Sequence, residues 1–263
     1  MFNRYIQLWL SFAKTSLARE IEYKGNFITQ IIVQLGWTMV SLVSIEIIFF
    51  NTESLVGWNK GELILIFAIY RSITALYAIF VRKNIRQLSS LVNSGEFDLL
   101  LTKPVNTLFM TCFRIVDLER LFSLLIGTFL VYYAHTISPI YWSFTTLSIL
   151  IICIISGSLI RFAVSLIIHT PIMWIQKLTN LERLEIAFFG ISRYPRQAFP
   201  PLVRGVFSFV FPVLFAAAAP AEILTQRSPS TFIIIILIVT FSFLLFMTRF
   251  FHFALRHYSS ASS

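Results

Sequence analysis

Five ionisable residues lie within or beside long apolar stretches of this chain, where a charge needs a partner. These residues are Glu46, Arg71, Arg114, Asp117 and Arg161. A charged side chain in the middle of a membrane span costs at least about 2.5 kcal/mol on insertion scales, so it has to face other protein groups or a water-filled cavity. Each of the five is therefore a candidate for an intramembrane ion pair or for the lining of a translocation path.

Arg114, Asp117 and Arg120 follow one another at intervals of three residues. On a helix the three share one face, so Asp117 can pair with either arginine. We interpret this group as structural, a pair that locks its helix to a neighbour. For Arg71 and Arg161 two interpretations stay open, a structural salt bridge and a cavity lining. A cavity lining would favour an anionic or zwitterionic amphiphile as cargo.

The usual signatures of nucleotide, metal and hydrolase chemistry are absent from the sequence. No G-x-x-x-x-G-K-[ST] segment occurs, so we expect no ATP site in this chain. The histidines lie far apart, and neither an H-E-x-x-H nor a G-x-S-x-G motif is present. Cys112 and Cys153 both fall in apolar stretches, which fits neither a disulfide framework nor a metal site. We expect no catalytic residue, metal or cofactor of its own.

The composition is that of a chain surrounded by lipid. Hydrophobic residues make up 57% of the 263 positions and charged residues 13%, and the mean hydropathy is +0.80. A soluble domain of this length needs more polar residues to cover its surface. The net charge of +9 comes from basic residues between apolar blocks, where they set topology and contact anionic lipid headgroups. We expect no nucleic-acid binding.

Six apolar segments can serve as membrane spans, each of which needs about 20 residues. The fifth is short and is interrupted by Pro212. These segments predict an all-α integral membrane protein that forms a single domain over residues 1–263. The predicted spans are residues 27–50, 62–81, 107–134, 141–168, 203–219 and 231–251.

Residues 1–25 are typical of an amphipathic helix rather than a span, because polar residues recur at helical spacing opposite a broad apolar side. Tyr5 and Trp9 would sit at the boundary between lipid and water. We expect this helix to lie in the membrane interface. The alternative is a solvated helix that packs on a partner.

The distribution of basic residues predicts the orientation, because cytoplasmic loops carry an excess of Lys and Arg. With the N-terminus inside, only Lys60 and Arg227 fall in outer loops. Both termini are therefore expected in the cytoplasm. The basic residues assigned to the inner side are Arg4, Lys14, Arg19, Lys24, Arg82, Lys83, Arg86, Lys103, Lys177, Arg183, Arg193, Arg196, Arg204, Arg249 and Arg256.

Two inner loops, residues 82–106 and 169–203, are long enough to carry function. In the first, Gly95 permits a turn, Asp98 can cap a short element and Pro104 ends it. Between them, residues 97–101 form an apolar knob that we expect to be exposed to the cytoplasm. Such a patch usually binds a partner. The alternative is that it dips into the membrane interface.

The stretch from Ser94 to Pro104 resembles the G-x-L-D-x-L-L-L-R-P signature of a family of type-2 ABC transporter permeases, six-span subunits of about this length. Phe97 replaces the usual leucine. Lys103 replaces the usual arginine and cannot make a bidentate carboxylate contact. Residues 255–262, Arg193-Tyr194-Pro195 and the spacing of Pro212 and Pro220 are similar to the family as well.

This resemblance implies a permease subunit of an ATP-driven exporter in the bacterial inner membrane. Its partners would be a second permease, identical or related, membrane lipids, and separate ABC ATPase subunits that hold ATP and magnesium. The family's short re-entrant helices would precede the last span; the alternative is a kinked helix with an outer turn at Pro220. The coupling contact with the ATPase would consist of Gly95, Glu96, Phe97, Asp98, Leu99, Leu100, Lys103 and Pro104.

Other classes of membrane protein remain as alternatives. A membrane scaffold or a lipid-modifying enzyme would act alone, so copurification of an ATPase separates it from an exporter subunit. An ion channel is disfavoured, because no span shows a repeated polar face.

Overall fold

The computed structural model describes the chain except for residues 1, 23, 139–141, 176–177, 179 and 259–263. The described residues form helices joined by short connections, and within them the only β pairing is an isolated bridge between Leu55 and Trp58. Among the described residues, five helices are long and apolar enough to cross a membrane. The chain is therefore an all-α integral membrane protein, as its composition predicted.

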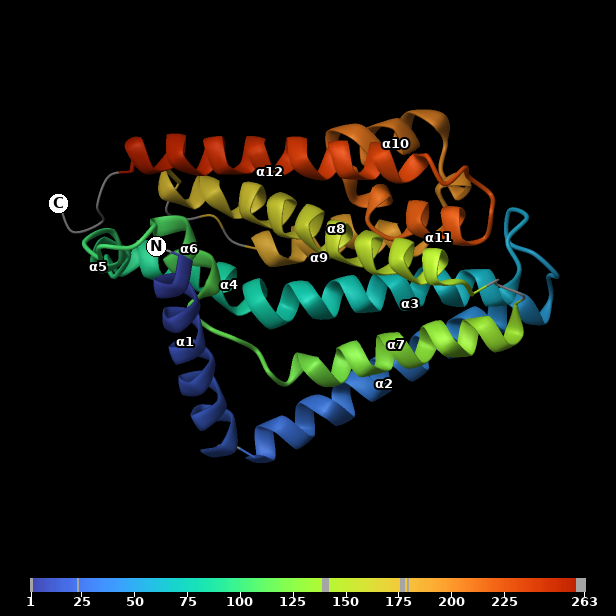
Figure 1. The fold of residues 1–263 in the computed structure, drawn as a ribbon, viewed down its shortest axis with the longest axis horizontal. Coiled ribbons are helices and arrows are strands. Elements are labelled where there is room, and N and C mark those ends of the chain that lie inside the picture. Colours follow the sequence, from blue (N-terminus) through green and yellow to red (C-terminus); the bar gives the residue numbers. More distant parts are fainter. Residues whose placement is uncertain (1, 23, 139–141, 176–177, 179, 259–263) are drawn as a thin grey trace.

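The long helices lie side by side along the longest dimension of the molecule (Figure 1). The second one is continuous from α3 through a π-helical turn into α4, so it extends well past the predicted end at residue 81. At 1.5 Å per residue its 34 residues span about 50 Å, more than the hydrocarbon core of a bilayer. The five are α2 (Lys24–Phe50), α3–α4 (Lys60–Asn93, with the π-turn at Ala78–Arg82), α7 (Arg120–Ile137), α8 (Phe144–His169) and α12 (Phe232–Arg256).

The first turn of α1 and the last turn of α12 lie at the same end of this bundle (Figure 1). The helix α1 (Phe2–Glu22) runs across the long helices, and the hydroxyl of Tyr5 accepts a hydrogen bond from the backbone of Asn106. Tyr258, which follows α12, packs against Phe97. We call this the terminal end, and the opposite end, which carries residues 51–59, the loop end.

The stretch predicted as the third span, residues 107–134, is not one helix. A short α6 (Thr107–Phe113) ends before the charged residues, and α7 begins only at Arg120. Residues 114–119 between them lack regular helical structure. The charged cluster therefore marks a break between two helices rather than one face of a single helix.

The segment Leu181–Ala198 crosses the bundle, although the sequence placed it in an inner loop. At its start Glu182 pairs with Arg82, near the terminal end of α3–α4. Near its finish the side chain of Gln197 accepts a hydrogen bond from the indole of Trp58, at the loop end. The segment consists of α9 (Leu181–Gly190) and two 3₁₀ turns, and it runs antiparallel to α3.

This crossing changes the predicted topology. Together with the five long helices it returns the chain to the terminal end, where α1 begins and α12 ends. Arg193 and Arg196 consequently belong to the loop-end half, and Arg204 belongs to the bent helix pair described next. The terminal end still carries more basic residues than the loop end, but the excess is smaller than predicted. Lys177, also assigned to the inner side, lies outside the described residues.

The predicted fifth span, residues 203–219, is a helix pair bent by 77° at Phe211. The first arm consists of α10 (Pro201–Gly205) and a π-turn (Val206–Val210), the second of a 3₁₀ turn (Pro212–Phe215) and α11 (Ala218–Leu224). It starts just after Gln197 and ends just before Arg227, both at the loop end.

A pair with both ends on one side is re-entrant rather than a crossing. Pro212 lacks the backbone N–H that would continue a helix, which explains the position of the bend. Pro220 lies inside α11, so the alternative of an outer turn at this proline is wrong. Residues 212–224 are all buried, as broken helix at membrane depth requires.

Glycines allow the closest helix contacts. A Cβ on Gly127 of α7 would lie 3.1 Å from the backbone nitrogen of Ser72 on α3, and one on Gly157 of α8 would lie 2.7 Å from the carbonyl oxygen of Ala216. Small residues let helix backbones approach in membranes, where packing rather than the hydrophobic effect drives association. These two positions fix α7 on α3, and α8 on the re-entrant pair.

Candidate coupling segment and buried charge networks

The predicted coupling segment forms a short helix at the terminal end, α5 (Phe97–Leu101). Gly95, which precedes it, has a φ of 76°, the left-handed conformation that favours glycine, so the predicted turn is present. Asp98 lies in the first turn of α5, whereas the cap position is Glu96. The carboxylate of Asp98 therefore does not occupy the capping position that the sequence indicated.

Only part of the apolar knob is exposed. The side chains of Leu99 and Leu101 are 63% and 39% exposed, but Phe97 and Leu100 are buried against α4 and α6. The expectation that all of residues 97–101 face the solvent is wrong for these two, because one turn of helix has an inner and an outer side. Glu96, Lys103 and Pro104 are exposed beside the two leucines.

The C-terminal end of α12 rests on the inner side of α5. The rings of Phe97 and Tyr258 meet edge to face, with centroids 5.3 Å apart. Burial, together with the Asp98 carboxylate beside the hydroxyl, raises the pKa of Tyr258. The short helix is thus held between α4, α6 and the last helix of the chain.

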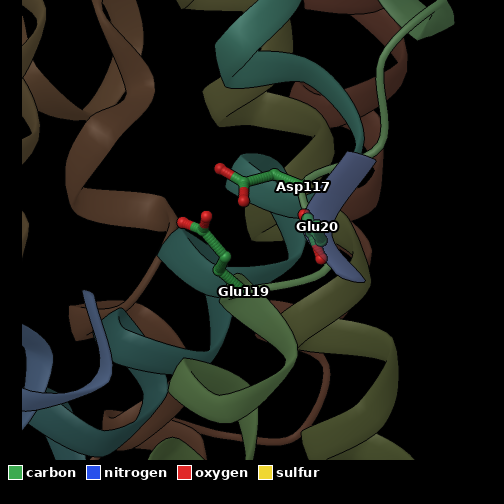
Figure 2. Close-up of side chains that lie close together, drawn as sticks. All are labelled: Glu20, Asp117 and Glu119. Atoms are coloured by element: carbon green, nitrogen blue, oxygen red, sulfur yellow. The ribbon is translucent and has the colours of Figure 1, made fainter. Parts of the chain in front are cut away.

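Residues 114–119 carry the next charge network, close to α1 (Figure 2). Asp117 is nearly fully buried and pairs with Lys83 of α4 at 3.0 Å and with Arg120 at 3.5 Å. Arg114 instead donates to the side chain of Gln87 at 3.2 Å. The sequence predicted that Asp117 could pair with either Arg114 or Arg120, and it pairs only with Arg120. Arg114 lies at the other end of the break between α6 and α7.

Side chains from other helices satisfy the backbone of this break. Asn84 of α4 accepts from the N–H of Ile115 and donates to its carbonyl, both at 2.8 Å. A carboxylate oxygen of Glu20 on α1 accepts from the N–H of Leu118 at 2.9 Å. Such bonds replace the intrahelical ones that a continuous helix would make, so the break is stable although it is partly buried.

Glu20, Asp117 and Glu119 bring their carboxylates within 4.8 Å of one another (Figure 2). Burial is the main cause that raises the pKa of Glu20, and the neighbouring carboxylates act in the same direction. The positive charges of Lys83 and Arg120 offset Asp117. The cluster is explained by these contacts, and the absence of a metal site stays a prediction.

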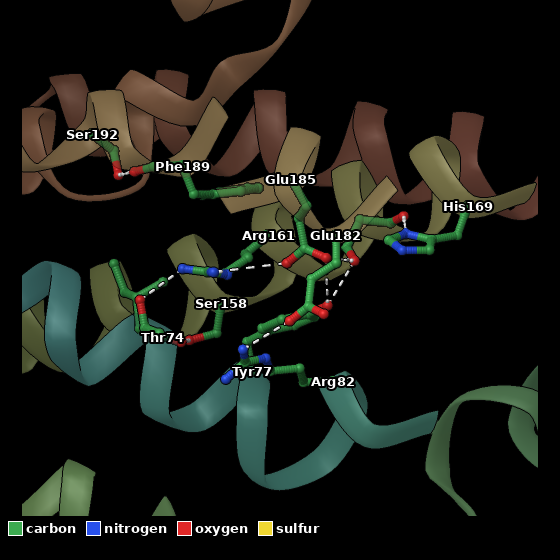
Figure 3. Close-up of polar contacts among 12 residues, drawn as sticks. Thr74, Tyr77, Arg82, Ser158, Arg161, His169, Glu182, Glu185, Phe189 and Ser192 are labelled. Carbon is green, nitrogen blue, oxygen red and sulfur yellow. Dashed lines mark hydrogen bonds and ion pairs between the residues drawn. The ribbon is translucent and has the colours of Figure 1, made fainter. Parts of the chain in front are cut away.

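Arg161 lies in a buried network between α3, α8 and α9 (Figure 3). Its guanidinium donates to Thr74 at 2.7 Å and lies 3.7 Å from a carboxylate oxygen of Glu185. The other oxygen of Glu185 accepts from Ser165 at 2.8 Å, and the hydroxyl of Tyr77 is 2.6 Å from that of Ser165. The side chains of Arg161 and Glu185 are only 5% and 4% exposed. Arg161 therefore forms a buried salt bridge with Glu185.

A second carboxylate of α9 anchors the same helix closer to the terminal end. Glu182 accepts from Arg82 at 2.9 Å and from Arg86 at 2.7 Å, which joins the start of α9 to α4 and the π-turn before it. Glu182 and Glu185 were not among the residues predicted from the sequence. Their spacing of three residues on one helical face was the available signal.

Of the remaining two predicted residues, Glu46 has an ion-pair partner and Arg71 has none among the described residues. Glu46, near the loop end of α2, pairs with Lys60 at the start of α3. Arg71 on α3 has two buried guanidinium nitrogens without a hydrogen-bond partner among the described residues. Arg71 therefore stays a candidate for contact with a group outside this chain.

Two arginine–carboxylate pairs fasten the re-entrant pair at the loop end, and the sequence indicated neither. Arg196 forms a bidentate pair with Glu222 of α11, in which the Nε of Arg196 donates to a carboxylate oxygen at 2.8 Å. Arg227 forms another with Glu62 of α3, at 3.0 and 2.7 Å. Bidentate pairs of this kind are geometrically specific. The second arm is thus tied to the crossing segment through Glu222 and to α3 through Arg227.

Residues 35–262 match the sequence model of a family described as "ABC-2 family transporter protein". The chain belongs to this family. Searches of curated proteins and of solved structures found no match. The matched part of this ABC-2 permease contains α5, the crossing segment Leu181–Ala198 and the re-entrant pair, whereas α1 precedes it. The family resemblance drawn from the sequence is confirmed.

Proposed function

We propose that this ABC-2 permease is the transmembrane subunit of an ATP-driven exporter. It forms the translocation path with a second permease, and separate ATPase subunits supply ATP and magnesium. The terminal end faces the cytoplasm of a bacterial inner membrane, and α5 docks on the ATPase. The observation that carries this proposal is the placement of α5, an apolar turn held on a rigid base at the terminal end.

The two sides of α5 fit a docking role. Leu99 and Leu101 offer an apolar contact of the kind that protein partners cover. Phe97 and Leu100 anchor the turn in the buried cluster beneath it. A contact that is fixed in this way transmits a rigid-body movement instead of absorbing it.

The connections of α5 also fit a transmission role. It follows α4, which is continuous with the membrane helix α3. Glu182 links α4 to α9, so a displacement of α4 reaches the crossing segment as well. A push on α5 would therefore move helices on both sides of the buried Arg161 network.

The basic residues support the proposed orientation. The terminal end carries Arg82, Lys83 and Arg86 on α4 and the turn before it, and Lys103 after α5. An excess of Lys and Arg is typical of the cytoplasmic side. Both termini would then be cytoplasmic, and α1 would lie in the inner membrane interface.

The test is copurification of an ATPase with the tagged full-length permease. Leu99→Glu should lower the amount of bound ATPase more than about tenfold, because an apolar anchor at the centre of an interface carries much of its free energy. Asn93→Glu, an exposed charge change at the end of α4, should leave it unchanged, as should Leu99→Met. Both leucine variants should reach the membrane in normal amounts.

Two results would count against the proposal. One is normal ATPase binding and transport with Leu99→Glu. The other is an enzymatic activity on lipids shown by the purified chain alone, without any nucleotide-hydrolysing companion; this would favour the lipid-modifying enzyme instead.

A further inference from the structure

A groove opens on the side of the bundle between α2, α3 and the crossing segment, and it has a volume of about 180 Å³. One wall of the groove is formed by α2, most of whose side chains are exposed. One cationic side chain, from the crossing segment, faces it. The residues that line the groove include Trp37, Ser41 and Ser44 of α2, Phe67 of α3, and Arg193 and Tyr194 of the crossing segment.

Arg193 is exposed and has no carboxylate partner among the residues that the structure describes. Its Nε donates to the carbonyl oxygen of Gly190 at 3.2 Å, and its guanidinium lies over the ring of Tyr70 at 5.8 Å. These contacts orient the guanidinium but leave its charge uncompensated. The other two arginines that contact aromatic rings in the loop-end half, Arg196 and Arg227, each have a glutamate partner.

Arg193 lies on the side of the bundle, far from its loop end. Tyr70, which it contacts, follows Lys60 by ten residues on α3, or about 15 Å along the helix. Lys60 with Glu46 marks the loop-end boundary, and a bilayer core is about 30 Å thick. A cation near the middle of this core is strongly disfavoured unless an anion or water meets it.

An identical second copy has no free carboxylate to offer at this depth. Four carboxylates lie along the loop-end half and the middle of the bundle: Glu46, Glu62, Glu185 and Glu222. Each pairs with a lysine or arginine of its own chain. Glu53 lies in the loop after α2, and the other acidic residues lie at the terminal end. The anion for Arg193 therefore comes neither from this chain nor from an identical copy of it.

We propose that this groove binds an anionic amphiphile from the bilayer. The acidic group of the ligand pairs with the Arg193 guanidinium, and its apolar chain lies along α2 beside Trp37. The hydroxyls of Ser41 and Ser44 donate to carbonyl oxygens of their own helix, so they do not compete for the anion. That such a ligand is cargo rather than bound lipid rests on the proposed function.

The test uses the full-length protein in phosphatidylcholine vesicles that contain phosphatidylglycerol with a photoreactive group on its acyl chain. We expect labelling of α2 near Trp37. Arg193→Gln should reduce this labelling about tenfold, the loss expected for a charge-assisted hydrogen bond, while Arg193→Lys should keep most of it. Arg183→Gln, at an exposed arginine near the start of α9, is the matched control and should label normally.

A phosphatidylcholine probe should label α2 weakly and equally in all four proteins. Equal labelling by the two probes, or labelling that Arg193→Gln leaves unchanged, would overturn the proposal. So would efficient cross-linking of Trp37→Cys between two copies, because the groove would then be an interface. Labelling requires neither an ATPase nor ATP, so its failure and the failure of the coupling test above can be told apart.

Discussion

The ring of Tyr258 packs edge-on against the ring of Phe97, so the last helix of the chain supports the short helix that we propose as the coupling contact. The two residues lie 161 positions apart in sequence, and neither is part of a membrane-spanning segment. The support extends to Asp98, which lies beside the Tyr258 hydroxyl. A residue near the C-terminus thus holds α5 in place.

Removal of this support should loosen α5 without unfolding the protein. An aromatic pair contributes about 0.5–1.5 kcal/mol beyond the burial of its area, so Tyr258→Ala should increase backbone hydrogen exchange of residues 97–101 roughly fivefold. Tyr258→Phe keeps the ring and should stay close to the natural protein. Exchange in α8 should be the same in all three, and an equal rise there would mean general destabilisation instead.

The buried pair of Arg161 and Glu185 should tolerate joint replacement better than the loss of one partner. Glu185→Leu leaves an unpaired guanidinium in the core, which costs about 3–5 kcal/mol when a buried pair is broken. The double variant with Arg161→Leu removes both charges and should recover much of this loss. Thermal unfolding in detergent measures the difference.

A matched exposed change, Glu96→Gln, controls for the removal of a carboxylate. Its Tm should equal that of the natural protein. A double variant as unstable as Glu185→Leu alone would show that Arg161 stabilises the fold through its contacts with Thr74 and the aromatic rings of Tyr77 and Phe189, and not through the ion pair.

The sequence predicted the helical class and the segments that are uniformly apolar. The first and sixth predicted spans coincide with α2 and α12, because Phe232 to Met247 and most of α2 contain no charge that could interrupt them. The family followed from residues 94–104, whose signature is local. These features depend on neighbours in the chain and not on the fold.

The crossing segment and the break before α7 could not be predicted, because distant residues make them stable. Glu182 and Glu185 lower the hydropathy of α9. Their charges are neutralised by Arg82 and Arg161, which are far away in the sequence. The break at residues 114–119 depends likewise on Asn84. A hydropathy profile shows where the charged residues are in the sequence but not which residues pair with them in the fold.

Glu20 should make the stability of the protein depend on pH. Its pKa is raised in the folded state, mainly by burial, so the folded state favours the protonated form. Stability from this group is complete below its unfolded pKa, about 4.3, and is lost as pH rises through the folded pKa. At neutral pH Glu20→Gln should therefore be more stable than the natural protein, and the difference should vanish in acid.

Unfolding midpoints at several pH values test this, with Glu22→Gln at the exposed end of α1 as the control. Glutamine keeps an oxygen that can accept from the N–H of Leu118, so the hydrogen bond itself is preserved. A lower midpoint for Glu20→Gln at neutral pH would show that the carboxylate is stabilised by Lys83 more than burial destabilises it.

Gly127 should be among the positions least tolerant of a larger residue. A Cβ there would lie 3.1 Å from the backbone nitrogen of Ser72 and closer still to its Oγ, so α7 would have to move away from α3. Overpacking of this kind costs about 1–3 kcal/mol, and Gly127→Val should exceed Gly127→Ala. On Gly36 of α2 a Cβ meets nothing within 4 Å, so Gly36→Ala should be neutral or gain up to about 1 kcal/mol from helix propensity. Equal effects of alanine at the two positions would mean that α3 and α7 do not depend on this close approach.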